Sequence, residues 1–196
     1  MPISVFDTIY KENLWKSQES RSGRGAELCN TESVRANLRN ALEYIGASTI
    51  LDASCGDFNW MKEIDLGDIQ YMGCDIVQEL IDQNIAKYTN EKRKFFQADI
   101  TRDKLPHVDL ILCRCTLYHL SFRNIRRAIN NLKRSGDFLL LTNMPRVTEN
   151  IDIEDGNYRK LNLEIDPICL PAPITFFMDA PSTNEILALY RSKDIA

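Results

Sequence analysis

The hydrophobic positions of this chain follow two spacings that alternate along its length. Apolar runs typical of strands occupy residues 48–53, 69–75, 94–99, 107–113 and 138–142. Apolar residues three and four positions apart, which are typical of helices, occupy residues 31–45, 77–88 and 121–135, with a shorter segment starting near 57. Strands and helices in this order predict an α/β fold with a doubly wound, mostly parallel, Rossmann-like sheet.

The N-terminal part of the chain has a different pattern. Residues 2–15 show helical spacing and predict a short amphipathic helix. The polar segment 17–26 follows, and its glycines allow two interpretations: a flexible linker, or a loop whose backbone approaches a ligand. We therefore divide the chain into an N-terminal helix and loop, residues 1–30, and a main domain, residues 31–196.

The C-terminal part is rich in turn-forming residues between 150 and 173. Two apolar runs, residues 174–178 and 185–190, then predict an antiparallel hairpin at one sheet edge. With this hairpin we predict a seven-stranded sheet with a late antiparallel strand. Residues 143–173 either shape a substrate pocket or form only a surface loop, and the sequence leaves both open.

Length and composition indicate one globular domain with a modest terminal extension. The chain has 196 residues, of which 44% are hydrophobic and 27% charged. The absence of a long apolar run and of a signal-like N-terminus predicts a cytoplasmic protein without a membrane partner. A net charge of −4 argues against a general nucleic-acid surface.

The cysteines indicate neither disulfides nor a metal site. Cys55, Cys74 and Cys113 lie in or beside apolar runs, where cysteine behaves as a small hydrophobic residue. Cys113 and Cys115 have the wrong spacing for a zinc knuckle, and no second cysteine or histidine pair accompanies them. We therefore predict no metal ion.

Acidic residues end the first three predicted strands, and they predict a nucleoside site. Asp52, Asp75 and Asp99 follow one another at the spacing of a βα unit. In open α/β sheets ligands bind outside the carboxyl ends of the strands. A carboxylate at the end of the second strand can accept hydrogen bonds from both hydroxyl groups of a ribose.

The first turn distinguishes between two cofactor classes. A nicotinamide dinucleotide would require several glycines there, but this turn has only Gly56, and Asp57 directly after it would repel a pyrophosphate. S-adenosylmethionine has no phosphate and carries two cationic groups, which nearby carboxylates favour. We therefore predict S-adenosylmethionine as the cofactor and disfavour a nicotinamide-dependent oxidoreductase.

Residues 51–56, with Asp75 and Asp99 downstream, resemble the class I S-adenosylmethionine-dependent methyltransferases. A wider pattern resembles a subset of small bacterial enzymes of this fold, and it includes the segments 57–61, 113–114 and 119–121. The resemblance implies cofactor-binding roles for Trp15, Ser20, Gly23, Asp52, Ser54, Gly56, Asp75, Ile76, Asp99, Ile100 and Arg114. In this scheme Asp52 and Gly56 line the methionine portion, and Asp75 holds the ribose.

The same scheme places the adenine and the cover of the site. Ile76 would pack on the adenine, and Asp99 with Ile100 would flank its amino group. Trp15, Ser20 and Gly23 would belong to an N-terminal cover over the cofactor.

The segment after the fourth predicted strand supplies the catalytic candidates. His119 is the candidate general base, because the unperturbed pKa of histidine is about 6.5; its alternative role is to pack under the helix that starts at Ser121. Tyr118 and Arg114 are further candidates, and Arg114 would suit an anionic acceptor. Cys115 departs from the subset, which has an aspartate there.

These features predict methyl transfer by in-line displacement to a small-molecule acceptor, such as a sugar or a phosphorylated metabolite. A protein methyltransferase remains an alternative, and so does a catalytically degenerate cofactor-binding partner, because of Cys115. Methylation of DNA bases is disfavoured by the acidic net charge. The sequence indicates neither the acceptor atom nor the oligomeric state.

Overall fold

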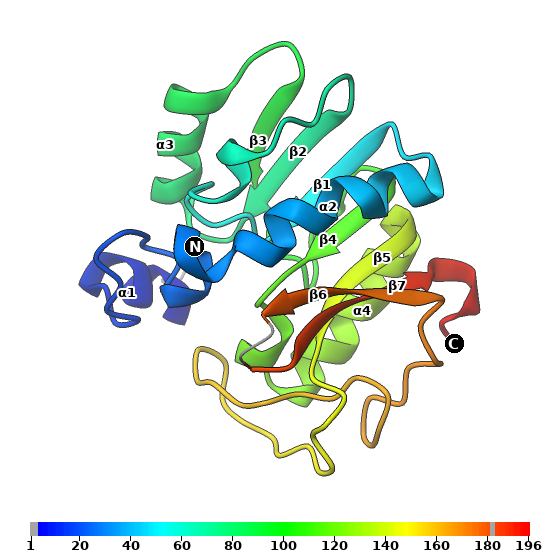
Figure 1. Ribbon diagram of the computed structural model, residues 1–196. Helices are drawn as coiled ribbons and strands as arrows, with labels where there is room; N and C mark the ends of the chain where they lie inside the picture. The colour runs from blue at the N-terminus through cyan, green and yellow to red at the C-terminus, as the bar shows by residue number, and fades with distance from the viewer. Residues whose placement is uncertain (1–3, 181–182) are drawn as a thin grey trace.

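The computed structural model of the chain describes residues 4–180 and 183–196, and it contains a seven-stranded sheet (Figure 1). The strands are β1 (Thr49–Ala53), β2 (Gln70–Asp75), β3 (Arg93–Gln97), β4 (Val108–Cys113), β5 (Gly136–Asn143), β6 (Thr175–Ala180) and β7 (Glu185–Arg191). Their order is β3-β2-β1-β4-β5-β7-β6; β7 runs antiparallel to β5 and β6 on either side of it, and the other neighbouring pairs are parallel. The predicted fold class and the late antiparallel strand are confirmed.

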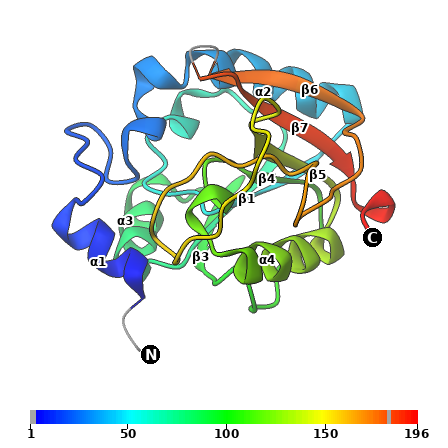
Figure 2. The ribbon, with the colours of Figure 1, turned by 90° about the horizontal axis from the view of Figure 1, so that it is seen from below.

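The main helices cover the two faces of the sheet. They are α1 (Val5–Glu12), α2 (Glu32–Ile45), α3 (Gln78–Tyr88) and α4 (Phe122–Ser135). Figure 2 shows α2 and α4 on opposite sides of the sheet, and each buries an apolar stripe at helical spacing. Leu38 and Leu42 of α2 belong to one core, and Ile125 and Ile129 of α4 belong to the other.

The helix predicted near residue 57 is wrong. Only a short 3-10 turn, η3 (Met61–Glu63), lies between β1 and β2. Gly56 and Phe58 have φ angles of 57° and 59°, and a non-glycine residue in this left-handed region cannot continue a right-handed helix. The glycine turn is therefore not followed directly by an α-helix N-terminus that could hold a phosphate.

The predicted N-terminal helix is shorter than expected. The prediction covered residues 2–15, of which 2 and 3 lie outside the described residues. Helix α1 ends at Glu12, because Asn13 adopts a left-handed conformation with a φ of 50° and closes the helix through its backbone N–H. The chain from residue 13 onward is thus free to turn toward the sheet.

The strand order creates a switch point beside β1. The chain moves outward from β1 through β2 to β3, and then returns to place β4 on the other side of β1. Ligands of open α/β sheets bind at such a point. After β5, residues 144–174 form neither helix nor strand, and this segment is yellow to orange in Figure 1. In the part of the chain that is described, every helix is too short or too polar to cross a membrane.

Candidate active site

A cavity lies at the switch point, and it collects residues from distant parts of the chain. The residues at the strand ends that line it include Asp52, Ser54, Gly56, Asp75, Ile76, Asp99, Ile100, Arg114 and His119. The N-terminal residues that line it include Phe6, Ile9, Tyr10, Trp15, Arg21, Ser22 and Gly25. The structure therefore brings most of the predicted site residues together, whereas Ser20, Gly23 and Tyr118 do not line the cavity.

Asp52 is a buried carboxyl group at the end of β1, with an exposed fraction of 2%. The hydroxyl group of Tyr71 donates a hydrogen bond to its Oδ2 at 2.9 Å. Burial raises the pKa of Asp52 to about 7, although this hydrogen bond and the charge of Arg114 oppose the shift. A cationic group bound in the cavity would favour the ionised form of Asp52.

Asp75 ends β2 and is oriented by backbone groups. Its Oδ2 accepts from the Gly56 N–H at 3.2 Å, and its Oδ1 accepts from the Val77 N–H at 3.1 Å. Burial raises its pKa, and these backbone hydrogen bonds oppose that shift. Each carboxylate oxygen has a second lone pair, so Asp75 can still accept from two hydroxyl groups.

Asp99 lies two residues beyond the end of β3, because the strand ends at Gln97 rather than at Asp99 as predicted. Its Oδ1 accepts from the N–H and the hydroxyl group of Thr101 at 2.9 and 2.7 Å. Its Oδ2 lies 3.2 Å from Nε of Arg102. Asp99 thus borders the cavity as a carboxylate that also fixes the local turn.

Asp57 holds the N-terminal segment over the first turn. Its carboxylate accepts from the Ser20 hydroxyl at 2.9 Å, the Arg21 N–H at 2.8 Å and the Ser22 hydroxyl at 3.2 Å. Ser22 closes tightly on Gly56, where a Cβ atom would lie only 2.2 Å from the Ser22 Oγ. Asp57 is therefore an anchor for residues 20–22, and Ser20 acts on the site through it.

Trp15 lies between the N-terminal segment and the catalytic candidates. Its ring stacks on His119 with a centroid distance of 4.8 Å. Gly23 makes room for it, since a Cβ atom there would lie 3.2 Å from the Trp15 Cβ, and its φ of 89° favours glycine. The predicted residue Gly23 thus positions Trp15 and does not itself line the cavity.

Arg114 is committed to a buried ion pair. Its Nε donates to both carboxylate oxygens of Asp179 on β6, at 2.9 and 3.0 Å, and its Nη1 donates to the Gly25 carbonyl at 2.7 Å. The guanidinium also stacks over Trp60 at 5.1 Å from the ring centroid. The prediction that Arg114 binds an anionic acceptor does not fit this geometry, because Asp179 already neutralises its charge.

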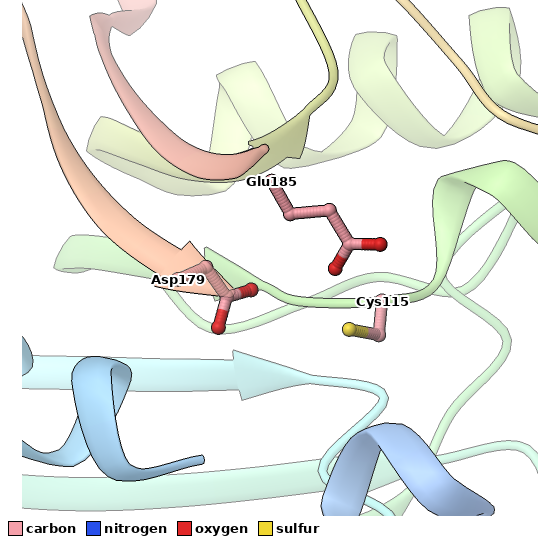
Figure 3. A group of neighbouring side chains, drawn as sticks. All are labelled: Cys115, Asp179 and Glu185. Carbon is pink, nitrogen blue, oxygen red and sulfur yellow. The ribbon is translucent and has the colours of Figure 1, made fainter. Parts of the chain in front are cut away.

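Cys115, Asp179 and Glu185 converge beside this pair (Figure 3), with ligand atoms within 4.8 Å of one another. Burial raises the pKa of Cys115 to about 11, so its side chain is a neutral thiol at pH 7, whereas a metal would require the thiolate. Asp179 also has both oxygens bonded to Arg114. We therefore interpret the cluster as the surroundings of a buried ion pair.

His119 presents one ring nitrogen as a proton acceptor. It ends the 3-10 turn η4 (Leu117–His119), and its Nδ1 lies 2.8 Å from the Asn157 carbonyl oxygen. A carbonyl oxygen only accepts, so Nδ1 carries the proton and Nε2 keeps its lone pair. Burial lowers the pKa of His119 to about 4, so the ring is neutral at pH 7.

Tyr118 does not line the cavity. Its side chain is buried with an exposed fraction of 8%, and its ring packs edge-on against Tyr158 at 5.2 Å. Burial raises its pKa well above the usual value, so its hydroxyl group keeps its proton. The structure therefore does not support the prediction of Tyr118 as a catalytic residue.

Comparison with known proteins identifies the domain. The sequence model of a family described as "methyltransferase domain" matches residues 50–135, which span β1 to α4 and carry the acidic strand ends. Residues 50–135 therefore carry the sequence pattern of that methyltransferase-domain family. The carboxylates of the cavity suit a ligand that carries positive charge, as the predicted cofactor S-adenosylmethionine does.

Solved structures share this methyltransferase fold over nearly the whole chain. The N-methyltransferase NodS from Bradyrhizobium japonicum, in complex with S-adenosyl-L-homocysteine, is 14% identical with a TM-score of 0.69, covering 96% of this chain and 98% of that one. Magnesium protoporphyrin IX methyltransferase from Synechocystis, with S-adenosylmethionine bound, is 16% identical with a TM-score of 0.64, covering 97% and 99%. At these identities the similarity shows the fold alone. No curated protein matches this chain by sequence.

Some methyltransferase site residues carried no signal in the sequence. Tyr71, whose hydroxyl group donates to Asp52, is one of several aromatic residues in the apolar runs. Asp179, the partner of Arg114, lies 65 residues away in the sequence. Arg21 and Ser22 could have been found more easily, because they belong to the polar segment 17–26 for which a ligand-facing loop was one interpretation.

Proposed function

We propose that this protein transfers the methyl group of S-adenosylmethionine to an oxygen atom of a small-molecule acceptor. The observation that carries the proposal is the meeting of Asp52, Asp75 and Asp99 in one cavity that His119 also lines. The cofactor supplies an activated methyl group. The protein then has to bind it, align the acceptor and receive the acceptor's proton.

The acidic residues would divide the cofactor between them. Asp52 would pair with its ammonium group beside Ser54 and Gly56, and Asp75 would bind the ribose hydroxyl groups. Ile76 would pack on the adenine, and Asp99 with Ile100 would flank its amino group. Support comes from their order along the cavity, since β1, β2 and β3 are neighbours in the sheet.

Residues 1–30 would form a cover over this site. Three contacts support the assignment: Asp57 holds Ser20 and Ser22, Arg114 holds the Gly25 carbonyl, and Trp15 stacks on His119. Residues 1–3 lie outside the described residues and do not enter this assignment. The remaining residues, 31–196, would form the methyltransferase domain.

His119 would receive the acceptor's proton at Nε2. As the acceptor oxygen bonds to the methyl carbon, the carbon–sulfur bond breaks and its electron pair stays on sulfur. The oxygen-bound proton becomes strongly acidic in this step. An imidazole with a pKa of about 4 can therefore take it, whereas it would not take a proton from a methylated ammonium group. The low pKa of His119 thus favours an oxygen acceptor over an amine.

Calorimetry tests the cofactor assignment. S-adenosylmethionine should bind, and NADH should not; binding of NADH alone would contradict the proposal. Asp75→Ala should weaken binding strongly because the ribose contacts are lost. Asp82→Ala, an exposed carboxylate of α3 outside the cavity, is the matched control and should leave affinity unchanged. A panel of hydroxylated metabolites, amines and peptides then identifies the acceptor by release of S-adenosylhomocysteine.

A further inference from the structure

Arg114 has one guanidinium nitrogen that its buried ion pair leaves unused. Its Nε donates to Asp179, and its Nη1 donates to the Gly25 carbonyl. Within residues 4–180 and 183–196, its Nη2 has no hydrogen-bond partner. Nη2 nevertheless keeps accessible surface, unlike the three guanidinium nitrogens of Arg159, which are fully enclosed. Because Arg114 lines the cavity at the switch point, its Nη2 group offers a hydrogen-bond donor to a ligand there.

The sheet places this donor beside Asp52. In the parallel pair β1–β4, Asp52 lies opposite Leu112, and Arg114 comes two positions later, directly after the end of β4. Neighbouring strands lie about 4.8 Å apart, and side chains two positions apart in extended chain share a face. Arg114 stacks over Trp60, which belongs to the same core as Tyr71, the hydrogen-bond partner of Asp52. The charge of Arg114 also opposes the rise in the pKa of Asp52. The two side chains are therefore neighbours on one wall of the cavity.

The amino acid end of S-adenosylmethionine carries opposite charges on one carbon atom. If Asp52 pairs with its ammonium group, its carboxylate has to lie next to Asp52 as well. Among the described residues that line the cavity, Arg21 and Arg114 are the cationic ones, since His119 is neutral at pH 7. Arg21 is exposed, and the charge that acts on the pKa of Asp52 is that of Arg114. Arg114 is thus the cation closer to the expected position of the carboxylate.

We propose that the Nη2 group of Arg114 binds the carboxylate of the cofactor's amino acid end. This proposal rests on the proposed binding of S-adenosylmethionine. It assigns one group of the cofactor to Arg114, for which the family resemblance implied only a cofactor-binding role. A hydrogen bond between a guanidinium and a carboxylate is stronger than one between neutral groups, and the closed surroundings of Arg114 strengthen it further.

The ion pair with Asp179 suits this role, although it does not suit an anionic acceptor. Negative and positive charges would alternate from Asp52 through the ammonium and carboxylate groups of the cofactor to Arg114 and Asp179. Each charge would then have an opposite charge beside it, and the bound amino acid end would add no net charge. An anionic acceptor would instead bring one unbalanced negative charge to a guanidinium that Asp179 already neutralises.

This contact would distinguish S-adenosylmethionine from its decarboxylated form, which keeps the adenine, the ribose, the sulfonium and the ammonium group. Calorimetry of the full chain with both ligands measures the ratio of the two affinities. Changes at the adenine, ribose or ammonium contacts alter both affinities, whereas loss of the carboxylate contact alters the ratio. We expect S-adenosylmethionine to bind at least tenfold more tightly, equivalent to about 1.4 kcal/mol. The decarboxylated form has the larger positive charge, so general attraction to the acidic cavity would favour it instead.

Two changes at Arg114 locate the contact. Arg114→Lys keeps a positive charge opposite Asp179 but has a single ammonium group in place of the guanidinium fork, so the ratio should fall several-fold. Arg114→Met with Asp179→Leu leaves no buried charge unpaired and should bring the ratio close to one. Urea unfolding shows that both variants are folded. Arg24→Gln is the matched control, because Arg24 is an exposed arginine of the same N-terminal segment outside the cavity, and it should keep the ratio of the wild type.

Arg21→Gln tests the rival cation of the cavity. A ratio that falls in Arg21→Gln but stays unchanged in both Arg114 variants would refute the role of Arg114. Equal affinity of the wild type for the two ligands would refute carboxylate recognition altogether. In both cases the binding of S-adenosylmethionine, and with it the proposed function, stands. If the wild type binds neither ligand, the proposed function itself fails.

Discussion

The affinity for S-adenosylmethionine should depend on pH through Asp52. Burial raises the pKa of this carboxyl group to about 7, so about half of the molecules have it ionised at pH 7 and about one-tenth at pH 6. The ammonium group of the cofactor would pair with the ionised form only. Affinity should therefore fall about fivefold between pH 7 and pH 6, or about 1 kcal/mol, and about tenfold more between pH 6 and pH 5.

Calorimetry measures this dependence in two ways. Titrations at pH 5, 6 and 7 give the affinities, and they stay below the range in which an α-amino group of pKa about 7.7–8.0 begins to lose its proton. Buffers of different ionisation enthalpy at pH 7 should report release of about half a proton on binding, because the bound cation lowers the pKa of Asp52. Asp52→Asn can still accept from Tyr71 but does not titrate, so its affinity should be lower and nearly independent of pH. If Asp52→Asn keeps the slope of the wild type, another group titrates and the reasoning is wrong.

Other substitutions test the remaining parts of the site. Gly56→Ala should lower the free energy of unfolding in urea by about 1–2 kcal/mol, because φ is 57° and the new Cβ would meet Ser22. Gly46→Ala is the control, since Gly46 has a similar φ but open space around it. If Gly56→Ala destabilises the fold less than Gly46→Ala does, the close packing at Gly56 is contradicted. Asp179→Asn should lower the free energy of unfolding by about 3 kcal/mol, because it leaves Arg114 buried without its counter-charge. The double variant Arg114→Met with Asp179→Leu should recover much of that stability. No recovery would argue against an isolated pair. His119→Ala should lower turnover about 100-fold with little change in cofactor affinity, and unchanged turnover would exclude His119 as the base.

The sequence predicted the sheet well because its strands are buried on both faces. β1, β4 and β5 are near-continuous apolar runs, and the acids in the last residues of β1 and β2 mark the strand ends that meet at the cavity. Helices α2 and α4 were equally clear, since each has an apolar stripe on an otherwise polar surface.

The errors came from interactions that no local pattern encodes. Trp60, Met61 and Ile64 have helical spacing, but the left-handed conformation at Phe58 prevents an α-helix there. The three side chains are nevertheless buried. Arg114 follows a strand like a residue that binds an acceptor, yet its partner Asp179 lies on a hairpin far along the chain. His119 has an ordinary sequence context, and only its burial lowers its pKa. Tertiary contacts decided each of these cases.

The N-terminal segment and the C-terminal hairpin are joined through one side chain. Arg114 donates to Asp179 on β6 with Nε and to the Gly25 carbonyl with Nη1, so the strand end of β4 ties together residues 25 and 179. Asp57 holds residues 20–22 from the β1 turn, and His119 holds Trp15 from the β4 side. The segment is thus fixed on both sides of the switch point, and the cavity lies between these attachments.

Entry of the cofactor from the N-terminal side would have to break some of these contacts. The Asp57 contacts, which are partly exposed, should open before the buried Arg114–Asp179 pair, because exposed charge-assisted hydrogen bonds cost less to open. Asp57, which the sequence suggested only as a deterrent to pyrophosphate, is therefore the residue that would set how easily the cover opens.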